Sequence, residues 1–251
     1  MYVAVDIGKS RTKILILKDF DFSKTEHFFL IDNDSVLSQK VLDLIPQSHV
    51  ILSSVRETQP QWIDTLKNHS LSFFFLNQNT PLPIINLYKQ KETLGLDRIA
   101  AACGAKTLFP SQNCLIIDMG TAITFDILTK QGEFLGGNIS AGAKTRLQAL
   151  NQFTGKLPLI SSHTLKEISK FSIGTNTKEA IINGVAQGIT FEINGYIHQT
   201  KKILNDDSLT TILTGGDAIY FENMIKNTTF AIEKLVLIGL LAILKHNIEK
   251  K

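Results

Sequence analysis

The sequence predicts an α/β protein made of two copies of one mixed-sheet domain. The pattern Asp-x-Gly-x-x-x-Thr occurs twice, and the two copies are 112 residues apart. Each copy lies between two apolar segments with strand character, and helical and strand patterns alternate after it. A chain of 251 residues is long enough for two small domains. A duplicated domain therefore explains both the repeat and its spacing.

The first copy begins with residues 3–17, which read VAVDIGKSRTKILIL and predict two strands joined by a tight turn. Further strand patterns occupy residues 25–31, 49–53 and 71–76. Helical patterns occupy residues 35–44, 59–67 and 97–108. Three strands followed by alternating helices and strands predict a mixed sheet, and we assign this copy to residues 1–112.

The second copy begins with residues 115–128, which read LIIDMGTAITFDIL, and we assign it to residues 113–251. Its strand patterns occupy residues 133–139 and 210–213, and its helical patterns occupy residues 143–152, 178–204, 218–225 and 233–247. Asn176 is the expected N-cap of the longest helix, with Glu179 completing a capping box. No linker rich in Pro, Gly or Ser separates the copies, so the cleft between them is the expected ligand site.

The composition excludes several classes of protein. With 43% hydrophobic and 20% charged residues, the chain is neither disordered nor fibrous. Two cysteines exclude a disulfide framework and a Cys-only zinc site, and the six histidines show no metal-ligand spacing. A net charge of +3 does not favour nucleic acid or a membrane surface as a partner. The N-terminus lacks the order of a signal peptide, and the cytoplasm is the expected location.

The two Asp-Gly loops are candidate phosphate sites. In the first, the carboxylate of Asp6 ends a strand, and backbone N–H groups with the hydroxyls of Ser10 and Thr12 would face a phosphate. The carboxylate would hold Mg²⁺ through water. An ordinary hairpin is the alternative, and the second copy at Asp118, followed by Asp126, argues against it. Neither loop is a Walker P-loop.

Two further motifs combine turn residues with chemistry. Gly215 and Gly216 end a strand and open a helix, so a nucleotide could approach the backbone there, although a turn that needs glycine would read the same. In Gly95-Leu96-Asp97-Arg98, Asp97 is either a helix cap or a general base. Arg98 is correspondingly either a solvated first-turn residue or a carboxylate clamp, and the pattern leaves both alternatives open.

Six motifs in this order resemble the type III pantothenate kinases. They are the first Asp-Gly loop, Gly95-x-Asp97-Arg98, residues 118–126, residues 136–139, residues 177–184 and residues 214–216. The family belongs to the superfamily of acetate kinase, sugar kinases, heat-shock chaperones and actin. The resemblance therefore implies two ribonuclease H-like domains of the actin-like ATPase type, each a mixed sheet flanked by helices, with the active site in the interdomain cleft.

The resemblance implies ATP-dependent phosphorylation of pantothenate to 4′-phosphopantothenate, the first step of coenzyme A synthesis. It also implies a homodimer that uses Mg²⁺ and a monovalent cation, K⁺ or NH₄⁺. Asp97 would be the base that accepts the proton of the substrate hydroxyl, Asp6 would hold magnesium through water, and Asp118 would hold the monovalent cation. Pantothenate would be bound by Tyr88, Gly95, Leu96, Asp97, Arg98 and Thr177. ATP and its phosphates would be bound by Asp6, Gly8, Lys9, Ser10, Thr12, Lys13, Gly120, Thr121, Gly215 and Gly216.

The chain departs from the family pattern at three places. Lys9 and Ser10 replace Asn-Thr, residues 89–91 replace a segment with Asn-Pro, and Ala141 replaces a proline. None of these changes removes a carboxylate. Two other functions stay open: a catalytically silent relative that binds a nucleotide or metabolite, and a superfamily kinase for another small alcohol or carboxylate. The intact carboxylates argue against the first, and the short chain argues against a sugar kinase.

Overall fold

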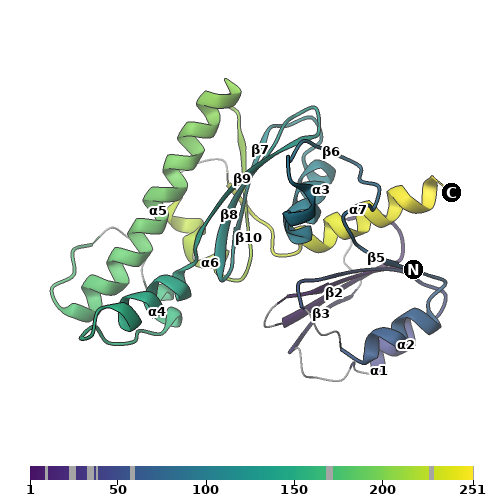
Figure 1. The fold of residues 1–251 in the computed structure, drawn as a ribbon, viewed down its shortest axis with the longest axis horizontal. Helices are drawn as coiled ribbons and strands as arrows, with labels where there is room; N and C mark the ends of the chain where they lie inside the picture. The colour runs from purple at the N-terminus through teal and green to yellow at the C-terminus, as the bar shows by residue number, and fades with distance from the viewer. Residues whose placement is uncertain are drawn as a thin grey trace. The chain divides into compact units, whose positions relative to one another are not determined.

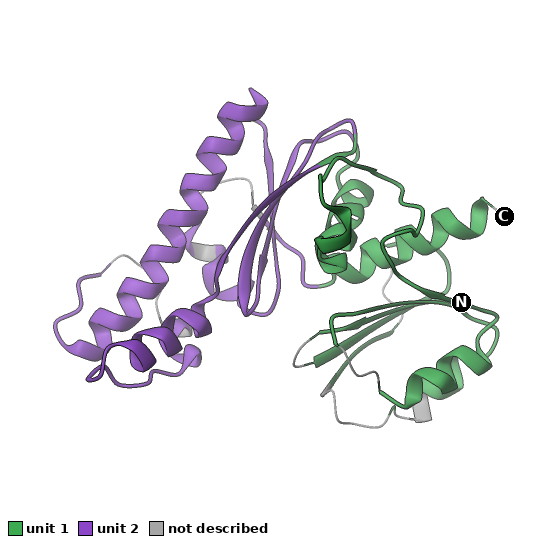
Figure 2. Cartoon of the chain, viewed as in Figure 1, with its two compact units in different colours: residues 1–110, 132–134, 234–251 green, residues 111–131, 135–233 purple. Residues whose placement is uncertain are grey.

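A computed structural model describes residues 1–8, 11–22, 27–32, 37, 39–56, 60–167, 172–225 and 229–250 (Figure 1). The chain forms two compact units (Figure 2). Unit 1 combines residues 1–110, 132–134 and 234–251, and unit 2 combines residues 111–131 and 135–233. Each unit has its own sheet, and each is described by itself.

Unit 1 contains a five-stranded mixed sheet, as the sequence predicts. Its strands in spatial order are β3 (His27–Asp32), β2 (Arg11–Leu17), β1 (Tyr2–Ile7), β4 (His49–Ser54) and β5 (Ser72–Phe75). The first three pair antiparallel, while β4 and β5 run parallel to β1. The central strand β1 therefore lies between the other half of its hairpin and a parallel neighbour, and it carries Asp6 near its end.

Helices cover both faces of this sheet (Figure 2). On one face, alternate strand residues such as Val3, Val5 and Leu52 form a core with α1 (Gln39–Leu44) and α2 (Trp62–His69). On the other face, α7 (Leu235–Glu249) packs against β1 and β4 and against α3 (Leu96–Leu108). Because side chains alternate along a strand, Asp6 and its neighbours in register point to this second face.

The helices α3 and α7 approach each other backbone to backbone. A Cβ atom added to Gly239 would lie 1.7 Å from the carbonyl oxygen of Ala100, and one added to Gly104 would lie 2.3 Å from that of Leu235. The second predicted domain, residues 113–251, includes α7, whereas α7 belongs to compact unit 1. The duplication boundary at residue 112 stays a prediction.

Unit 2 repeats the topology of unit 1. Its strands are β7 (Cys114–Met119), β8 (Ala122–Leu128), β9 (Glu133–Ala141), β10 (Thr210–Thr214) and β11 (Thr229–Ala231). They are arranged as β11-β10-β7-β8-β9, and this order matches β5-β4-β1-β2-β3 strand for strand. The start of β9 lies in unit 1, where β6 (Ile85–Asn86) pairs with it. The predicted duplicated α/β architecture is thus confirmed by the sheet order.

Helices α4 (Ala143–Phe153), α5 (Thr177–Leu204) and α6 (Ala218–Phe221) pack on one face of the unit 2 sheet (Figure 1). The side chain of Asn176 caps α5 by accepting a hydrogen bond from the Glu179 N–H at 3.0 Å, as predicted. The Glu179 carboxylate bonds Thr175 rather than the N-cap residue. Strands β6 and β11 and the 3-10 turns at Lys91–Thr93 and Ser162–Glu167 were not predicted, whereas the 3-10 turn at Glu222–Met224 lies within the helical pattern predicted for residues 218–225.

Within the described ranges, none of the helices combines the length and the apolar character that crossing a membrane requires.

Candidate active site

The first Asp-Gly hairpin places Asp6 among polar side chains at the end of β1. Asp6 pairs with Lys13 on β2 and with Ser53 on β4. Directly paired residues of neighbouring strands share a face, so these three side chains point to the face covered by α7. The Gly8 N–H donates to the carbonyl of Arg11 at 3.0 Å and closes the turn. The predicted site residues Lys9 and Ser10 lie outside the described residues.

Thr12 lies on the other face of the sheet. It pairs with Ile7, whose side chain belongs to the core with α1 and α2, and only 1% of Thr12 is exposed. Its predicted contact with a phosphate would have to come from its backbone, because its hydroxyl and the Asp6 carboxylate point in opposite directions.

Ser53 is a polar residue near Asp6 that the sequence analysis does not single out. It is fully buried, and its hydroxyl has no hydrogen-bond partner in the described part of the chain. A buried unsatisfied hydroxyl destabilises a fold by about 1–3 kcal/mol. The neighbouring Ser54 differs, since its hydroxyl accepts a hydrogen bond from the Arg56 N–H at 3.2 Å.

The start of α3 gathers the residues predicted to bind pantothenate. Gly95 is the N-cap residue, so the alternative in which Asp97 caps the helix is wrong. Asp97 Oδ1 instead accepts a hydrogen bond from the Arg98 N–H at 2.9 Å. A Cβ atom on Gly95 would lie 2.5 Å from this Oδ1, so glycine leaves the room that the carboxylate occupies. Leu96 is the first residue of the helix.

Arg98 is not a solvated first-turn residue, because only 6% of it is exposed. Its guanidinium carbon lies 5.6 Å from the centre of the Tyr88 ring, within the range of a cation–π contact. Tyr88 is fixed in turn by a hydrogen bond from its N–H to the side chain of Asn86. Unit 1 therefore brings Tyr88, Gly95, Asp97 and Arg98 together, as predicted.

The second Asp-Gly hairpin lies between β7 and β8 in unit 2. Asp118 pairs with Thr124 on β8 and with Thr214 on β10, so the three side chains share a face. The Gly120 N–H donates to the carbonyl of Ala122 at 3.0 Å. A Cβ atom added to Gly120 would lie 3.8 Å from the carbonyl oxygen of Ala122 and 3.9 Å from Asp118 Oδ1, which are ordinary van der Waals distances.

Residues from two other segments brace this hairpin. The carbonyl of Thr121 accepts hydrogen bonds from the Gly142 N–H at 3.0 Å and from the Thr145 hydroxyl at 2.7 Å. Gly215 has a φ of +89°, and a Cβ atom there would lie 2.5 Å from Asp118 Oδ1. Unit 2 thus brings Asp118, Gly120, Thr121 and Gly215 together, while Gly216 next to them has open space around its Cα.

Asp217 is a second residue that the sequence analysis does not single out. Its N–H donates to the carbonyl of Met119 at 3.0 Å, which ties the start of α6 to the hairpin. Burial raises the pKa of its carboxyl above the ordinary value, and the positive charges of His163 and Lys144 oppose this rise. The signal that could have identified Asp217 is its place directly after the two glycines.

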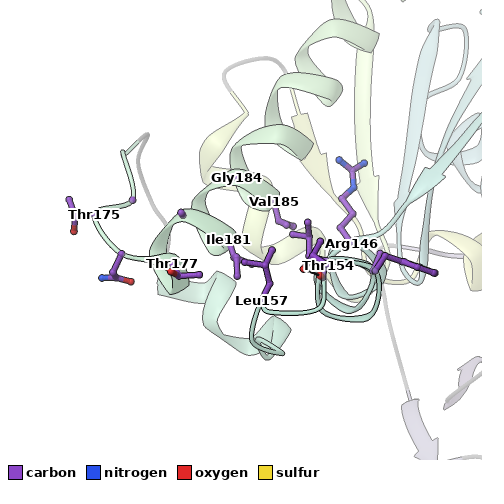
Figure 3. Close-up of a pocket in the computed structure, with 14 residues that line it drawn as sticks. Arg146, Thr154, Leu157, Thr175, Thr177, Ile181, Gly184 and Val185 are labelled. Atoms are coloured by element: carbon purple, nitrogen blue, oxygen red, sulfur yellow. Dashed lines mark hydrogen bonds between the residues drawn. The ribbon is translucent and has the colours of Figure 1, made fainter.

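A pocket of about 980 Å³ opens between α4 and the start of α5 (Figure 3). Thr177, the remaining residue predicted to bind pantothenate, lies on its rim at the first turn of α5. Most of the lining is apolar, as at Leu150, Leu157 and Ile181. The pocket suits a small molecule with an apolar part and a few polar groups.

Arg146 joins the pocket to the end of β9. Its side chain rises from α4 toward α5 and the sheet (Figure 3). The guanidinium donates to the carbonyl of Ala141 at 2.7 Å and to the hydroxyl of Ser140 at 3.0 Å, and it forms an ion pair with Glu192. The residue after Ala141 is Gly142, so this network also supports the segment that braces Thr121.

The carboxylates of the site suit a metal ion that is held partly by substrate phosphates better than one that is held by protein side chains alone. No group of three or more His, Cys, Asp or Glu side chains that could hold a metal ion occurs among the residues that the structure describes. Mg²⁺ keeps several waters and commonly takes one or two carboxylates together with substrate phosphates. Asp6, with Lys13 and Ser53 on the same face, fits that chemistry.

Comparison with known proteins identifies relatives along nearly the whole chain. The profile of the type III pantothenate kinase family matches residues 2–199. A type III pantothenate kinase from Bacteroides fragilis is 37% identical over 98% of this chain and 98% of its own length. One from Azobacteroides pseudotrichonymphae is 39% identical over 97% and 96%, and one from Flavobacterium johnsoniae is 33% identical over 99% of each.

Solved structures resemble the chain in fold. A Campylobacter jejuni protein described as a Baf family transcriptional activator has a TM-score of 0.65 and 22% identity over 98% of this chain and 99% of its own. The activator of 2-hydroxyisocaproyl-CoA dehydratase from Clostridium difficile, with bound ADPNP, has a TM-score of 0.55 and 14% identity over 100% and 97%. These likenesses confirm the predicted actin-like, ribonuclease H-like fold.

Proposed function

The chain belongs to the type III pantothenate kinase family, and from that premise we propose how its residues carry out the reaction. The enzyme transfers a phosphoryl group from ATP to pantothenate and forms 4′-phosphopantothenate, the first step of coenzyme A synthesis. Such a transfer depends mainly on positioning the two substrates and on neutralising charge at the phosphates.

Asp97 is the proposed general base, which accepts the proton of the pantothenate hydroxyl as that oxygen attacks the terminal phosphorus of ATP. The carboxylate lies in the first turn of α3, where one oxygen is held by the Arg98 N–H. The other oxygen remains available as an acceptor, since a carboxylate has about four lone-pair sites. A carboxylate within hydrogen-bond reach of an alcohol is a suitable base.

Arg98 is the proposed partner of the pantothenate carboxylate. Its guanidinium is buried and positioned beside Tyr88, and a preorganised guanidinium binds a carboxylate through two parallel hydrogen bonds. Gly95 and Leu96 would contribute backbone contacts at the start of the helix. Thr177 would contribute its hydroxyl from the rim of the unit 2 pocket, whose apolar lining suits the aliphatic part of the substrate.

The two Asp-Gly hairpins are the proposed phosphate sites. In the first, Asp6, Gly8, Lys9, Ser10, Thr12 and Lys13 would contact the phosphates, and Asp6 would hold Mg²⁺ through water. In the second, Gly120 and Thr121 would face the phosphates, Asp118 would hold K⁺ or NH₄⁺, and Gly215 and Gly216 would lie along the nucleotide. When bound, the cations would neutralise charge on the phosphoryl oxygens. The open space at Gly216, where an added Cβ atom would meet nothing within 4 Å, supports this assignment.

We further propose that the enzyme acts as a homodimer in the cytoplasm. Phe153, which lines the unit 2 pocket, is an exposed large apolar side chain, as is Ile173, which directly precedes the lining residue Gly174, and a second copy of the chain would bury them. ATP as a substrate is consistent with a cytoplasmic location. Sedimentation at micromolar concentration tests the dimer, and a monomer at that concentration would exclude it.

One observation carries the proposed mechanism: a carboxylate and a buried arginine occupy consecutive positions at the start of α3, next to Tyr88. Asp97→Asn tests it. We expect kcat to fall by about a thousandfold, in the range that general base catalysis supplies, while ATP affinity measured by calorimetry changes less than about threefold. An equal loss of ATP affinity would place Asp97 at the metal instead.

The assay itself separates the proposed substrate from the alternatives. ATP consumption is measured with pantothenate, with hexoses and with acetate, each with and without K⁺. We expect turnover with pantothenate only, and a strong dependence on K⁺. Asp207→Asn is the matched control, because Asp207 is an exposed carboxylate outside every predicted motif, and full activity is expected.

A further inference from the structure

We propose that Ser53 is a positioning residue of the phosphate site, and that its hydroxyl donates a hydrogen bond to the Asp6 carboxylate when a metal–nucleotide complex is bound. This inference rests on the proposed role of Asp6. It assigns a function to a residue outside all six sequence motifs. It concerns a hydrogen bond only, and no proton or covalent bond is transferred.

The register of the sheet places the two residues side by side. Asp6 of β1 pairs directly with Ser53 of the parallel strand β4. Val5 and Ile7, on either side of Asp6, and Leu52, directly before Ser53, belong to the core with α1 and α2. Asp6 and Ser53 therefore share the opposite face. Neighbouring strands lie about 4.8 Å apart, so rotation of the serine hydroxyl brings it within reach of an adjacent carboxylate.

The hydroxyl of Ser53 does not stabilise the protein in the absence of a ligand. The residue is fully buried, and within the described residues its hydroxyl neither donates nor accepts a hydrogen bond. An alanine would fill nearly the same space without leaving a polar group unsatisfied. The hydroxyl can therefore act as a donor once an acceptor at the site comes within its reach.

Binding of a nucleotide with its metal supplies that change. An Asp6 carboxylate that holds a metal-bound water needs a fixed orientation, and a donor from the neighbouring strand provides it. Lys13, on the other side of Asp6, lies on a partly exposed strand end, whereas Ser53 is shielded from solvent. A hydrogen bond shielded from water orients its acceptor more firmly than an exposed one.

Ser53→Ala tests the proposal, with Thr211→Val as its matched control. Thr211 is also fully buried, and within the described ranges its hydroxyl has no hydrogen-bond partner, but it is the second residue of β10, where it pairs with Leu115. Thermal unfolding without ligands and calorimetric titration with Mg-ATP are measured for both variants. We expect both to melt at or above the temperature of the unchanged protein. We expect only Ser53→Ala to weaken Mg-ATP binding and to lower kcat/KM, by about tenfold.

A double variant shows whether Ser53 acts through Asp6. In an Asp6→Asn background, Ser53→Ala should change kcat/KM less than about twofold, because the acceptor has already lost its charge. A full additional loss would overturn the proposal, as would unchanged Mg-ATP binding in Ser53→Ala. A lower melting temperature in Ser53→Ala with unchanged affinity would make the residue purely structural. Absence of pantothenate turnover in the unchanged protein would instead overturn the proposed function, while the titration would still test Ser53.

Discussion

The two Asp-Gly hairpins have the same residue spacing but a different register. In unit 1 the last pair of the hairpin is Ile7 with Thr12, so four residues connect the strands. In unit 2 the last pair is Met119 with Ile123, so three residues connect them. Thr124 consequently faces the same side as Asp118, while Thr12 faces away from Asp6. A shift of one residue moves a side chain to the opposite face of a sheet.

The unit 2 hairpin is braced by segments from elsewhere in the chain. Gly142, Thr145, Gly215 and Asp217 all contact the unit 2 hairpin through its backbone or its aspartate. In unit 1, the Gly8 N–H donates a hydrogen bond to the carbonyl of Arg11, and the Val55 N–H donates one to the carbonyl of Ile7. The comparison teaches that the unit 2 copy of the motif is held by segments that lie well beyond the hairpin in the sequence.

The largest effect is expected from a substitution that disrupts the packing of Gly142 against the unit 2 hairpin. In Gly142→Ala, the new Cβ atom would lie 2.0 Å from the carbonyl oxygen of Gly120 and 2.7 Å from that of Thr121. Both are backbone atoms, so the hairpin must move. We expect the free energy of unfolding, measured in urea, to fall by about 3 kcal/mol.

Gly120→Ala is the matched variant on the hairpin itself. Its Cβ atom would lie 3.8 Å from the carbonyl oxygen of Ala122, an ordinary van der Waals distance. We therefore expect the free energy of unfolding to stay within about 0.5 kcal/mol of that of the unchanged protein. If both alanine variants unfold at the same urea concentration, the contact with Gly142 does not support the hairpin.

A smaller effect is expected from Thr145→Val, which removes one of the two hydrogen bonds to the carbonyl of Thr121. The Gly142 N–H still satisfies that carbonyl, so the loss of stability should be about 1 kcal/mol. We expect a severalfold rise in the KM for ATP, because Thr121 is less firmly held. Thr145→Ser should restore the KM, and a persistent defect in it would point to packing instead.

The smallest expected effect concerns the pH dependence of stability. Burial raises the pKa of Asp217, so the folded state binds its proton more tightly than the unfolded state. Stability should therefore fall as the pH rises from the ordinary value of 3.8 through the raised pKa. Asp217→Asn should remove this fall, as followed by thermal unfolding at a series of pH values. A parallel pH profile for the variant would show that another group is responsible.

The parts of the site that lie in short motifs could be predicted from the sequence. Two such pairs are Asp97 with Arg98 and Asp118 with Gly120. Because the members of each pair are one or two residues apart, they lie close together in the fold. The difference in register between the two hairpins could not be predicted, because Thr12 follows Asp6 at the same spacing as Thr124 follows Asp118. Ser53 and Arg146 were not predicted, because the residues that they meet are distant in the sequence. Ser53 pairs with Asp6, 47 residues away, and Arg146 bonds Glu192, 46 residues away.

The same distinction applies to the fold. Strands and helices with strong periodicity, such as α5, were predicted because their core side chains recur locally. Strand β6, two residues long, has too little sequence to give a pattern. The membership of α7 in unit 1 depends on its contact with α3, and no local pattern reports a contact between segments so far apart.

The crossing of α3 and α7 has a consequence for how the chain folds as it is synthesised. All five strands of the unit 1 sheet have been synthesised once β5 is made. The helix α7, which packs on one face of that sheet, is synthesised only after the whole of unit 2. Until residues 235–249 leave the ribosome, the apolar side of α3 and of β1 has no cover from that helix. Helix α3, which carries Asp97, is thus packed by a segment that is translated only after the whole of unit 2.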